Sequence, residues 1–279
     1  MIDSHAHLDS PRYDDDRLEL LERAFAAGVR AILSIGIGDG PPDMHRALEI
    51  SREFSGRAST PKIWATAGVH PHEARLADDA AYAKLDELLQ QPEVLACGEI
   101  GLDYFYDHSP RDTQKSVFIR QMEIAAARRK PIVIHCRPSN NSTDAWDDTL
   151  DLIRTHWSST GLGGILHCFT GEIRHALQAI DLGFLISFAG NITFPKAQPI
   201  RDAALAVPLD SMLIETDAPF LAPIPNRGKR NEPAWVKEVA VKIAELRSLP
   251  PDEVSSRTTS NFAAFFGAEI PTPARHLAQ

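Results

Sequence analysis

The chain has 279 residues, of which 43% are hydrophobic and 24% charged, a composition typical of a globular protein with a large core. It contains no apolar run near the ~20 residues that a membrane-spanning helix needs, and no basic segment followed by an apolar stretch at its start, so we predict neither a membrane partner nor a secretory signal. The formal net charge of −9 argues against the broad basic surface of a nucleic-acid coat protein. A phosphate-bearing substrate is compatible with this charge, because bound metal ions can supply local positive charge.

The cysteine content points to a reducing environment. Only three cysteines are present, Cys97, Cys136 and Cys168. This small, odd number excludes a disulfide framework and favours a cytoplasmic location.

Short apolar runs rich in Ile, Val and Leu predict eight β-strands. They lack a regular polar–apolar alternation, as expected for parallel strands that are covered on both faces. In chain order the predicted strands are Ile2–His5, Ala31–Ile35, Ile63–Ala67, Val94–Glu99, Ile132–His135, Gly164–His167, Phe184–Phe188 and Met212–Glu215.

Helical segments separate these strands. Apolar residues three and four positions apart form one stripe in each of several segments: Leu18, Leu21 and Phe25; Phe118, Met122 and Ala125; Trp146, Leu150, Ile153 and Trp157; Val236, Val239, Ala240 and Ile243. The strand–helix alternation predicts a (β/α)8 TIM barrel, with an open doubly wound sheet as the alternative. We find no repeat or linker, so we predict one domain over residues 1–270, a last helix over Pro250–Gly267 and a flexible tail over 271–279.

Polar residues with metal-binding chemistry follow the predicted strands at their carboxyl ends, where barrel enzymes place their active sites. They are His5, His7, Glu99, His135, His167 and Asp217. His5 and His7 are two positions apart, so an extended backbone directs both imidazoles to one face. Two unrelated polar residues at a strand end are the alternative for this pair.

The carboxylates among these residues have the chemistry of metal ligands and bases. Glu99 ends an apolar strand and needs a partner, which is either an arginine or a pair of cations that it bridges. Asp217 is a candidate metal ligand and general base, and Glu215 is a candidate for supporting a ligand. We predict that Asp103, His72 and His108 lie in a solvated loop, and that Cys136 and Cys168 point away from the site as small buried hydrophobic residues. A thiolate metal site is the alternative for these cysteines.

Substrate contacts are expected beyond the metal ligands. His70 follows the third predicted strand and is a candidate substrate contact. Arg227, Lys229 and Arg230 follow the eighth strand on a basic loop that we interpret as a phosphate clamp, with a solvated turn as the alternative. Three aromatic residues near strand ends serve either base stacking or core packing, namely Phe169, Phe194 and Phe220.

Taken together, these motifs resemble the TatD family of metal-dependent hydrolases, within the amidohydrolase-like TIM barrels. The matching segments run in family order: Asp3–Asp9, Gly68–Pro71, Gly98–Asp103, Pro131–His135, His167–Gly171, Glu215–Pro219 and Arg230–Pro233. The resemblance implies a two-metal phosphodiesterase, typically a Mg²⁺-dependent deoxyribonuclease. It implies one metal held by His5, His7, Glu99 and Asp217, a second held by Glu99, His135 and His167, and a place for His70 in the substrate site.

One segment departs from the family pattern. The family usually has an acidic residue and alanine directly after the arginine of its His-x-Arg segment, whereas here the six residues 138–143 separate Arg137 from Asp144. The insertion leaves the predicted ligands untouched, but it bears on substrate access and on the role of Arg137.

Several functional alternatives stay open at this point. The metal is Mg²⁺, Mn²⁺ or Zn²⁺, because imidazole ligands suit Zn²⁺ while the resemblance implies Mg²⁺. A lactonase-like amidohydrolase and a D-aminoacyl-tRNA deacylase are rival ester or amide hydrolases, and a metal-binding barrel without activity is a third reading. We expect DNA or a nucleotide-derived phosphodiester as substrate and no obligate protein partner.

Overall fold

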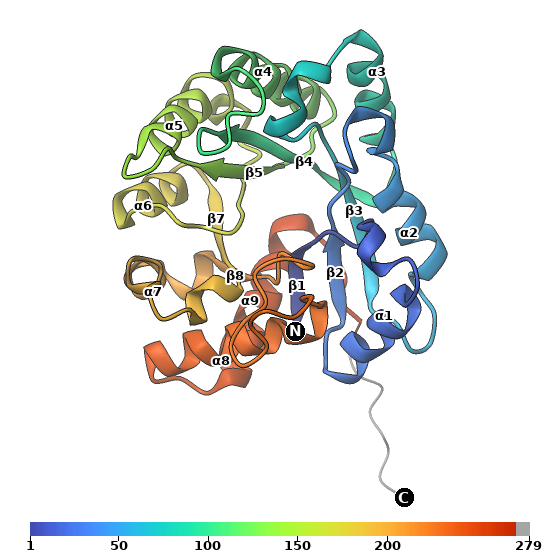
Figure 1. Cartoon of the computed structure of the whole chain (residues 1–279), viewed down its shortest axis with the longest axis vertical. Coiled ribbons are helices and arrows are strands. Elements are labelled where there is room, and N and C mark those ends of the chain that lie inside the picture. Colours follow the sequence, from blue (N-terminus) through green and yellow to red (C-terminus); the bar gives the residue numbers. More distant parts are fainter. Residues whose placement is uncertain (272–279) are drawn as a thin grey trace, which may run out of the picture.

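The computed structural model describes residues 1–271 as eight parallel strands surrounded by helices (Figure 1). Each strand pairs with the next one along the chain, in the order β1 to β8. The strands are β1 Ile2–Ala6, β2 Ala31–Ser34, β3 Lys62–Ala67, β4 Val94–Asp103, β5 Ile132–Arg137, β6 Gly164–Leu166, β7 Phe184–Phe188 and β8 Met212–Ile214. The chain then returns to β1 directly after β8, where Ala218 forms a parallel bridge with Ala6. This contact closes the sheet and confirms the predicted TIM barrel.

Helices follow the strands around the outside of the barrel. Their bounds are α1 Arg17–Ala26, α2 Arg46–Phe54, α3 Asp79–Leu88, α4 Arg111–Ala127, α5 Asp144–His156, α6 Ile173–Asp181, α7 Gln198–Ala206, α8 Val236–Arg247 and α9 Pro251–Phe266. The predicted last helix is α9, which ends at Gly267 with a left-handed φ of 61°. Apart from Pro271, the predicted tail lies outside the described residues. None of the helices within residues 1–271 is long and apolar enough to cross a bilayer.

The interior of the barrel is apolar at the amino-terminal ends of its strands. Side chains from successive strands meet Phe262 of α9 there, among them Ile2, Leu33, Trp64 and Val133. The Phe262 ring lies 5.9 Å from that of Trp64 and is fully buried. Because this end is filled, polar side chains inside the barrel can meet solvent only at the opposite, carboxyl-terminal end.

Two strands run further toward that end than the sequence indicates. β4 continues past Glu99 to Asp103, and β5 continues past His135 to Arg137, with Asp103 paired to Arg137. The register shifts between Cys97 and Ile100, so the two strands stay paired across an irregularity. Asp103 is therefore fully buried on a strand, and the prediction that it lies in a solvated loop is wrong.

Candidate metal centre

The six predicted ligands come together at the carboxyl-terminal end of the barrel, with Glu99 at the centre. One of its oxygens, Oε2, lies 3.4 Å from His5 Nε2 and 3.7 Å from His7 Nε2. His7 Nε2 in turn lies 3.4 Å from Asp217 Oδ1. These four side chains converge from β1, the residue after it, β4 and the segment after β8.

The other oxygen of Glu99 faces a second group. Glu99 Oε1 lies 2.9 Å from His135 Nδ1 and 2.7 Å from His167 Nε2. Each carboxylate oxygen of Glu99 thus faces its own set of imidazole nitrogens. Both sets have ligand atoms close enough together to hold one metal ion each.

Glycine allows Glu99 to occupy this central position. Gly101 adopts a φ of 140°, and a Cβ added to it would lie 2.0 Å from the carbonyl oxygen of His135. Only glycine permits this backbone conformation and this close approach. β4 can therefore stay paired with β5 while Glu99 projects into the barrel mouth.

Carboxylates outside the ligand set orient two of the histidines. His135 Nε2 lies 3.1 Å from Asp103 Oδ2, and His167 Nδ1 lies 3.2 Å from Glu215 Oε1. A carboxylate that accepts a hydrogen bond from one imidazole nitrogen fixes the proton there and leaves the other nitrogen free to bind metal. Asp103 and Glu215 are thus placed where they can support His135 and His167 as ligands. His72 Nε2 also contacts Asp103 Oδ2, at 2.8 Å, and is only partly exposed.

The pKa shifts of the proposed ligands differ in direction. Burial is outweighed by neighbouring carboxylates, which raise the pKa of His7 to about 8 and also raise the pKa of His135 and His167, so these imidazoles would release a proton on binding a metal ion.

His5 and Glu99 are already in the form that a metal ligand needs. Burial, reinforced by the nearby His167, lowers the pKa of His5, so this imidazole stays neutral. Burial would raise the pKa of Glu99, but the neighbouring imidazoles of His167 and His5 hold it well below its usual value. A neutral imidazole and an ionised carboxylate are the forms that coordinate metals. Together with Asp217, they form a nitrogen and oxygen donor set that fits divalent ions.

Two buried polar atoms near the ligands lack hydrogen-bond partners in the described part of the chain. They are His5 Nδ1 and Glu215 Oε2. The rings of His5 and His167 stack at 3.8 Å, which places these two incomplete groups in the same region of the site. An ion that binds His5 through Nε2 would leave a proton on Nδ1, the nitrogen without a partner.

His70 presents a proton to the site. Its Nδ1 accepts a hydrogen bond of 3.2 Å from the backbone N–H of His72. Burial lowers the pKa of His70 to about 3, so the ring is neutral and its proton is on Nε2. Nε2 lies 3.6 Å from Glu99 Oε1. His70 therefore directs an N–H group, and not a lone pair, toward the two ligand sets.

A cavity of about 890 Å³ opens over these residues. Besides His70 and five of the predicted ligands, its lining includes Asp103, His72, His108, Tyr106, Arg137 and Phe220. No sequence motif predicts a function for Tyr106, and the sequence alone leaves the role of Arg137 open. The position of Arg137 in the site could have been predicted from the sequence, because it follows His135 by two positions and thus projects from the same face of β5.

The basic loop lies outside this lining. Arg230 donates to both oxygens of Asp16, at 2.7 and 2.6 Å. Arg227 packs over the ring of Phe194, with Cζ 4.4 Å from its centroid. Lys229 is exposed. Phosphate binding by this loop stays a prediction, and for Arg230 it would require the ion pair with Asp16 to break.

The cysteines and the remaining aromatic residues divide between core and cavity. Cys136 is buried and accepts a hydrogen bond from Thr149, as expected for a packing residue, although it borders the cavity. Cys168 also borders the cavity, so the prediction that it points away is wrong. β6 ends at Leu166, and Cys168 takes a left-handed φ of 42°, which removes the strand alternation. Phe169 is fully buried, whereas Phe220 is 49% exposed at the cavity mouth.

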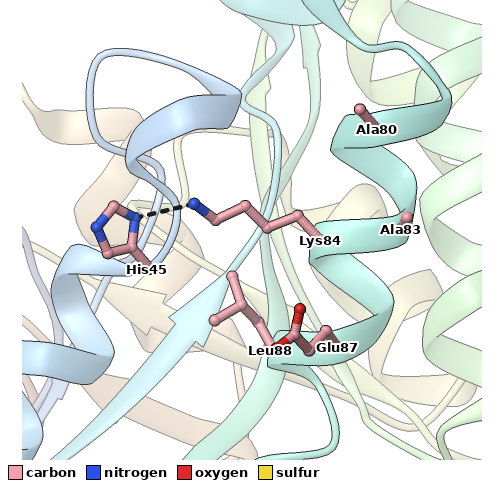
Figure 2. A pocket seen from close by; sticks show the side chains of 6 residues that line it. All are labelled: His45, Ala80, Ala83, Lys84, Glu87 and Leu88. Carbon is pink, nitrogen blue, oxygen red and sulfur yellow. Dashed lines mark hydrogen bonds between the residues drawn. The ribbon is translucent and has the colours of Figure 1, made fainter.

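A second pocket lies on the outer surface near α2 and α3 (Figure 2). It measures about 620 Å³, and Lys84 Nζ contacts His45 Nδ1 there at 3.2 Å. The described lining includes one histidine and one carboxylate, His45 and Glu87. These residues do not form a metal-binding set, whereas the candidate metal ligands lie together at the barrel mouth.

The chain is similar to known proteins in sequence and in fold. Residues 2–267 match the family model of TatD related DNase. An uncharacterized metal-dependent hydrolase of Bacillus subtilis, YabD, is 40% identical over 266 residues, covering 95% of this chain and 98% of its own. The 3′-5′ ssDNA/RNA exonuclease TatD of Klebsiella pneumoniae is 31% identical over 275 residues, covering 97% and 99%. The crystal structure of the TatD homologue YjjV of Escherichia coli superposes with a TM-score of 0.86 at 29% identity, covering 96% and 98%.

Proposed function

The chain belongs to the TatD family of metal-dependent hydrolases, and on that premise we propose that it hydrolyses phosphodiester bonds of nucleic acids, as a deoxyribonuclease. The position of Glu99, with one oxygen toward each imidazole set, carries this proposal. A relative of this chain is named as an exonuclease of single-stranded DNA and RNA, which supports a nucleic-acid substrate.

We propose that the site holds two divalent ions, Mg²⁺, Mn²⁺ or Zn²⁺. His5, His7, Glu99 and Asp217 would hold one ion, and Glu99, His135 and His167 the other. When bound, two such ions stabilise the charge on the phosphoryl and leaving oxygens and lower the pKa of water. Glu99 belongs to both candidate sets, so it would help to hold both ions.

Asp217 is the proposed general base. Burial would raise the pKa of Asp217, but the hydrogen bond from His7 and the charge of His167 lower it, so the carboxylate is ionised and can accept a proton. It borders the cavity, where a water molecule can reach it. Asp217 would take a proton from the attacking water as the water oxygen bonds to phosphorus and the P–O bond to the leaving oxygen breaks. The leaving oxygen would then gain a proton from solvent water.

His70 is the proposed donor to the substrate. Its Nε2–H group points toward Glu99 from the cavity wall, on the side of His135. A neutral donor placed there would bind a phosphoryl oxygen and strengthen its hydrogen bond as negative charge develops on that oxygen. Arg227 and Lys229, and Arg230 if released from Asp16, would contact phosphates further along the strand.

We propose a cytoplasmic location for the protein, because it has few cysteines.

The rival hydrolases are less well supported. Many binuclear amidohydrolases use a carboxylated lysine on the fourth strand, where this chain has Glu99. Relatives above 30% identity include proteins named as uncharacterized metal-dependent hydrolases and as an ssDNA/RNA exonuclease TatD. The lactonase-like amidohydrolase alternative is therefore not favoured, and an acyl-tRNA assay decides between the nuclease and the deacylase.

Substitution of the two carboxylates tests the proposal. We expect Glu99→Ala and Asp217→Ala each to lower kcat on single-stranded DNA by at least ~10²-fold, because one removes the shared ligand and the other the base. Circular dichroism should show that both variants stay folded, and Glu123→Ala on the outer face of α4 serves as the control. The wild-type enzyme is assayed in parallel on four other substrates: RNA, bis(p-nitrophenyl) phosphate, a lactone and an acyl-tRNA. Hydrolysis of the lactone or acyl-tRNA alone, or near-normal DNA hydrolysis by either variant, would refute the proposal.

A further inference from the structure

The guanidinium of Arg137 lies against two aromatic rings at the mouth of the cavity. Its Cζ is 4.1 Å from the ring centroid of Phe105 and 4.7 Å from that of Tyr106. Contact with ring faces leaves the N–H groups of arginine available for hydrogen bonds. Within residues 1–271 these N–H groups have no hydrogen-bond or ion-pair partner, and no other lysine or arginine lines the cavity. Arg137 is thus a free cation in the wall of the site.

The strand register places Arg137 beyond the metal centre. It lies two residues after His135 on β5, on the same face and roughly 7 Å closer to the open end of the barrel. A group bound by Arg137 is therefore adjacent to a group bound between the two ligand sets, and is separate from it.

Asp103 holds the backbone that carries the two aromatic rings on which Arg137 rests. Its Oδ1 accepts hydrogen bonds from the backbone N–H groups of Phe105, at 3.0 Å, and Tyr106, at 2.8 Å. Tyr106 also stacks on His108, with ring centroids 5.4 Å apart. The backbone of this turn is thus held from the direction of the metal centre, while the rings of Phe105 and Tyr106 are 40% and 49% exposed.

The inserted loop after Arg137 is held by Arg111 at the start of α4. Arg111 donates to Asp107 at 2.9 Å in the loop that follows Tyr106. It also donates to Ser139 Oγ at 2.9 Å and Asp144 Oδ2 at 3.1 Å on the other side of Arg137. One side chain thereby connects the segment that carries the rings to the segment that follows Arg137.

We propose that Arg137 binds a phosphate group of the nucleic-acid strand next to the scissile phosphodiester, and that Arg111 is a positioning residue for this contact. The proposal rests on the proposed function. Arginine pairs with phosphate through two parallel hydrogen bonds. Because the rings already restrict the side chain, binding orders it at a lower entropic cost. The insertion at 138–143 would then help to position this contact through the bond of Ser139 to Arg111.

A comparison of two substrates tests the role of Arg137. A single-stranded oligonucleotide offers neighbouring phosphates, whereas bis(p-nitrophenyl) phosphate offers one phosphodiester alone. We expect Arg137→Ala to lower kcat/KM on the oligonucleotide by roughly 10- to 100-fold, at least tenfold more than on the small diester. The slope of log KM against log salt concentration should fall by about 0.7. Equal losses on both substrates, or an unchanged slope, would overturn the proposal. Failure of the wild-type enzyme to cleave any nucleic acid would instead refute the proposed function.

A double-mutant cycle tests the role of Arg111. Arg111→Ala should raise KM for the oligonucleotide with little change in kcat, and the variant that combines it with Arg137→Ala should be no worse than Arg137→Ala alone. Arg120→Ala is the matched control, because Arg120 is on the same helix and pairs with Glu123. Melting temperatures report whether each variant folds, and Arg111→Lys, which retains a charge, replaces Arg111→Ala if that variant does not. Additive losses would show that Arg111 does not act through Arg137.

Discussion

Asp103 accepts a hydrogen bond from His135 Nε2 at 3.1 Å, which leaves His135 Nδ1 facing Glu99. Asp103→Asn preserves the shape of the side chain, and its remaining oxygen can still hold the backbone of the next turn. If the amide nitrogen replaces Oδ2, it presents a donor to His135 and shifts the proton to Nδ1. We expect metal affinity of the His135 set to fall by 10- to 100-fold, as measured by metal titration. Asp151→Asn, at an exposed position on α5, is the control. Unchanged affinity would contradict the supporting role of Asp103.

The tautomer of His70 predicts different outcomes for two amide substitutions. Glutamine places its amide nitrogen near the position of Nε2, whereas asparagine reaches only as far as Nδ1. We expect His70→Asn to lower kcat by roughly 10- to 100-fold, since one donor to the developing charge is lost, and His70→Gln to retain most of the activity. Metal content should be unchanged in both variants. Loss of metal from either one would show instead that His70 is a ligand.

Removal of metal should affect both activity and stability. The ligands come from β1, β4, β5, the segment after β6 and the segment after β8, so bound ions connect distant parts of the barrel. We expect a chelator to abolish hydrolysis and readdition of metal to restore it. An ion present at 100 times its Kd should raise the free energy of unfolding by about 2.7 kcal/mol. Thermal melting with and without chelator measures this difference, and hydrolysis that persists after exhaustive chelation would refute metal dependence.

The pair of Arg230 and Asp16 predicts a pH-dependent contribution to stability. The hydrogen bond from Arg230 lowers the pKa of Asp16, so the pair stabilises the fold above the pKa of the unfolded carboxyl and this stabilisation is lost as the pH falls through the folded pKa. Both side chains are about a third exposed, so we expect Arg230→Ala to cost at most about 1 kcal/mol at pH 7. The difference from wild type should shrink below about pH 4. Denaturant unfolding at several pH values measures it.

Substitution of the neighbouring Lys229 distinguishes an effect of this loop on substrate binding from an effect on stability. Lys229→Ala should leave the free energy of unfolding unchanged, because the side chain is exposed, and should raise KM for DNA if the loop contacts phosphate. An unchanged KM in Lys229→Ala and Arg227→Ala would reject the phosphate clamp.

The sequence by itself determined the barrel and the identity of its candidate ligands. Apolar runs of strand length, separated by segments with helical periodicity, admit few folds, and the carboxyl ends of parallel strands meet at one end of the barrel. Glu99, His135 and His167 could therefore be expected together, although their motifs are far apart along the chain. The order of the motifs identified the family.

Tertiary structure decided what local patterns do not encode. The burial of Asp103 depends on β4 staying paired with β5 beyond an irregularity, and hydrophobic periodicity carries no information about such a shift. The partner of Arg230 is Asp16, 214 residues away, and no local signal predicts that ion pair. The free guanidinium of Arg137 likewise follows from its packing on Phe105 and Tyr106, since a side chain's partners are set by which segments the fold brings side by side.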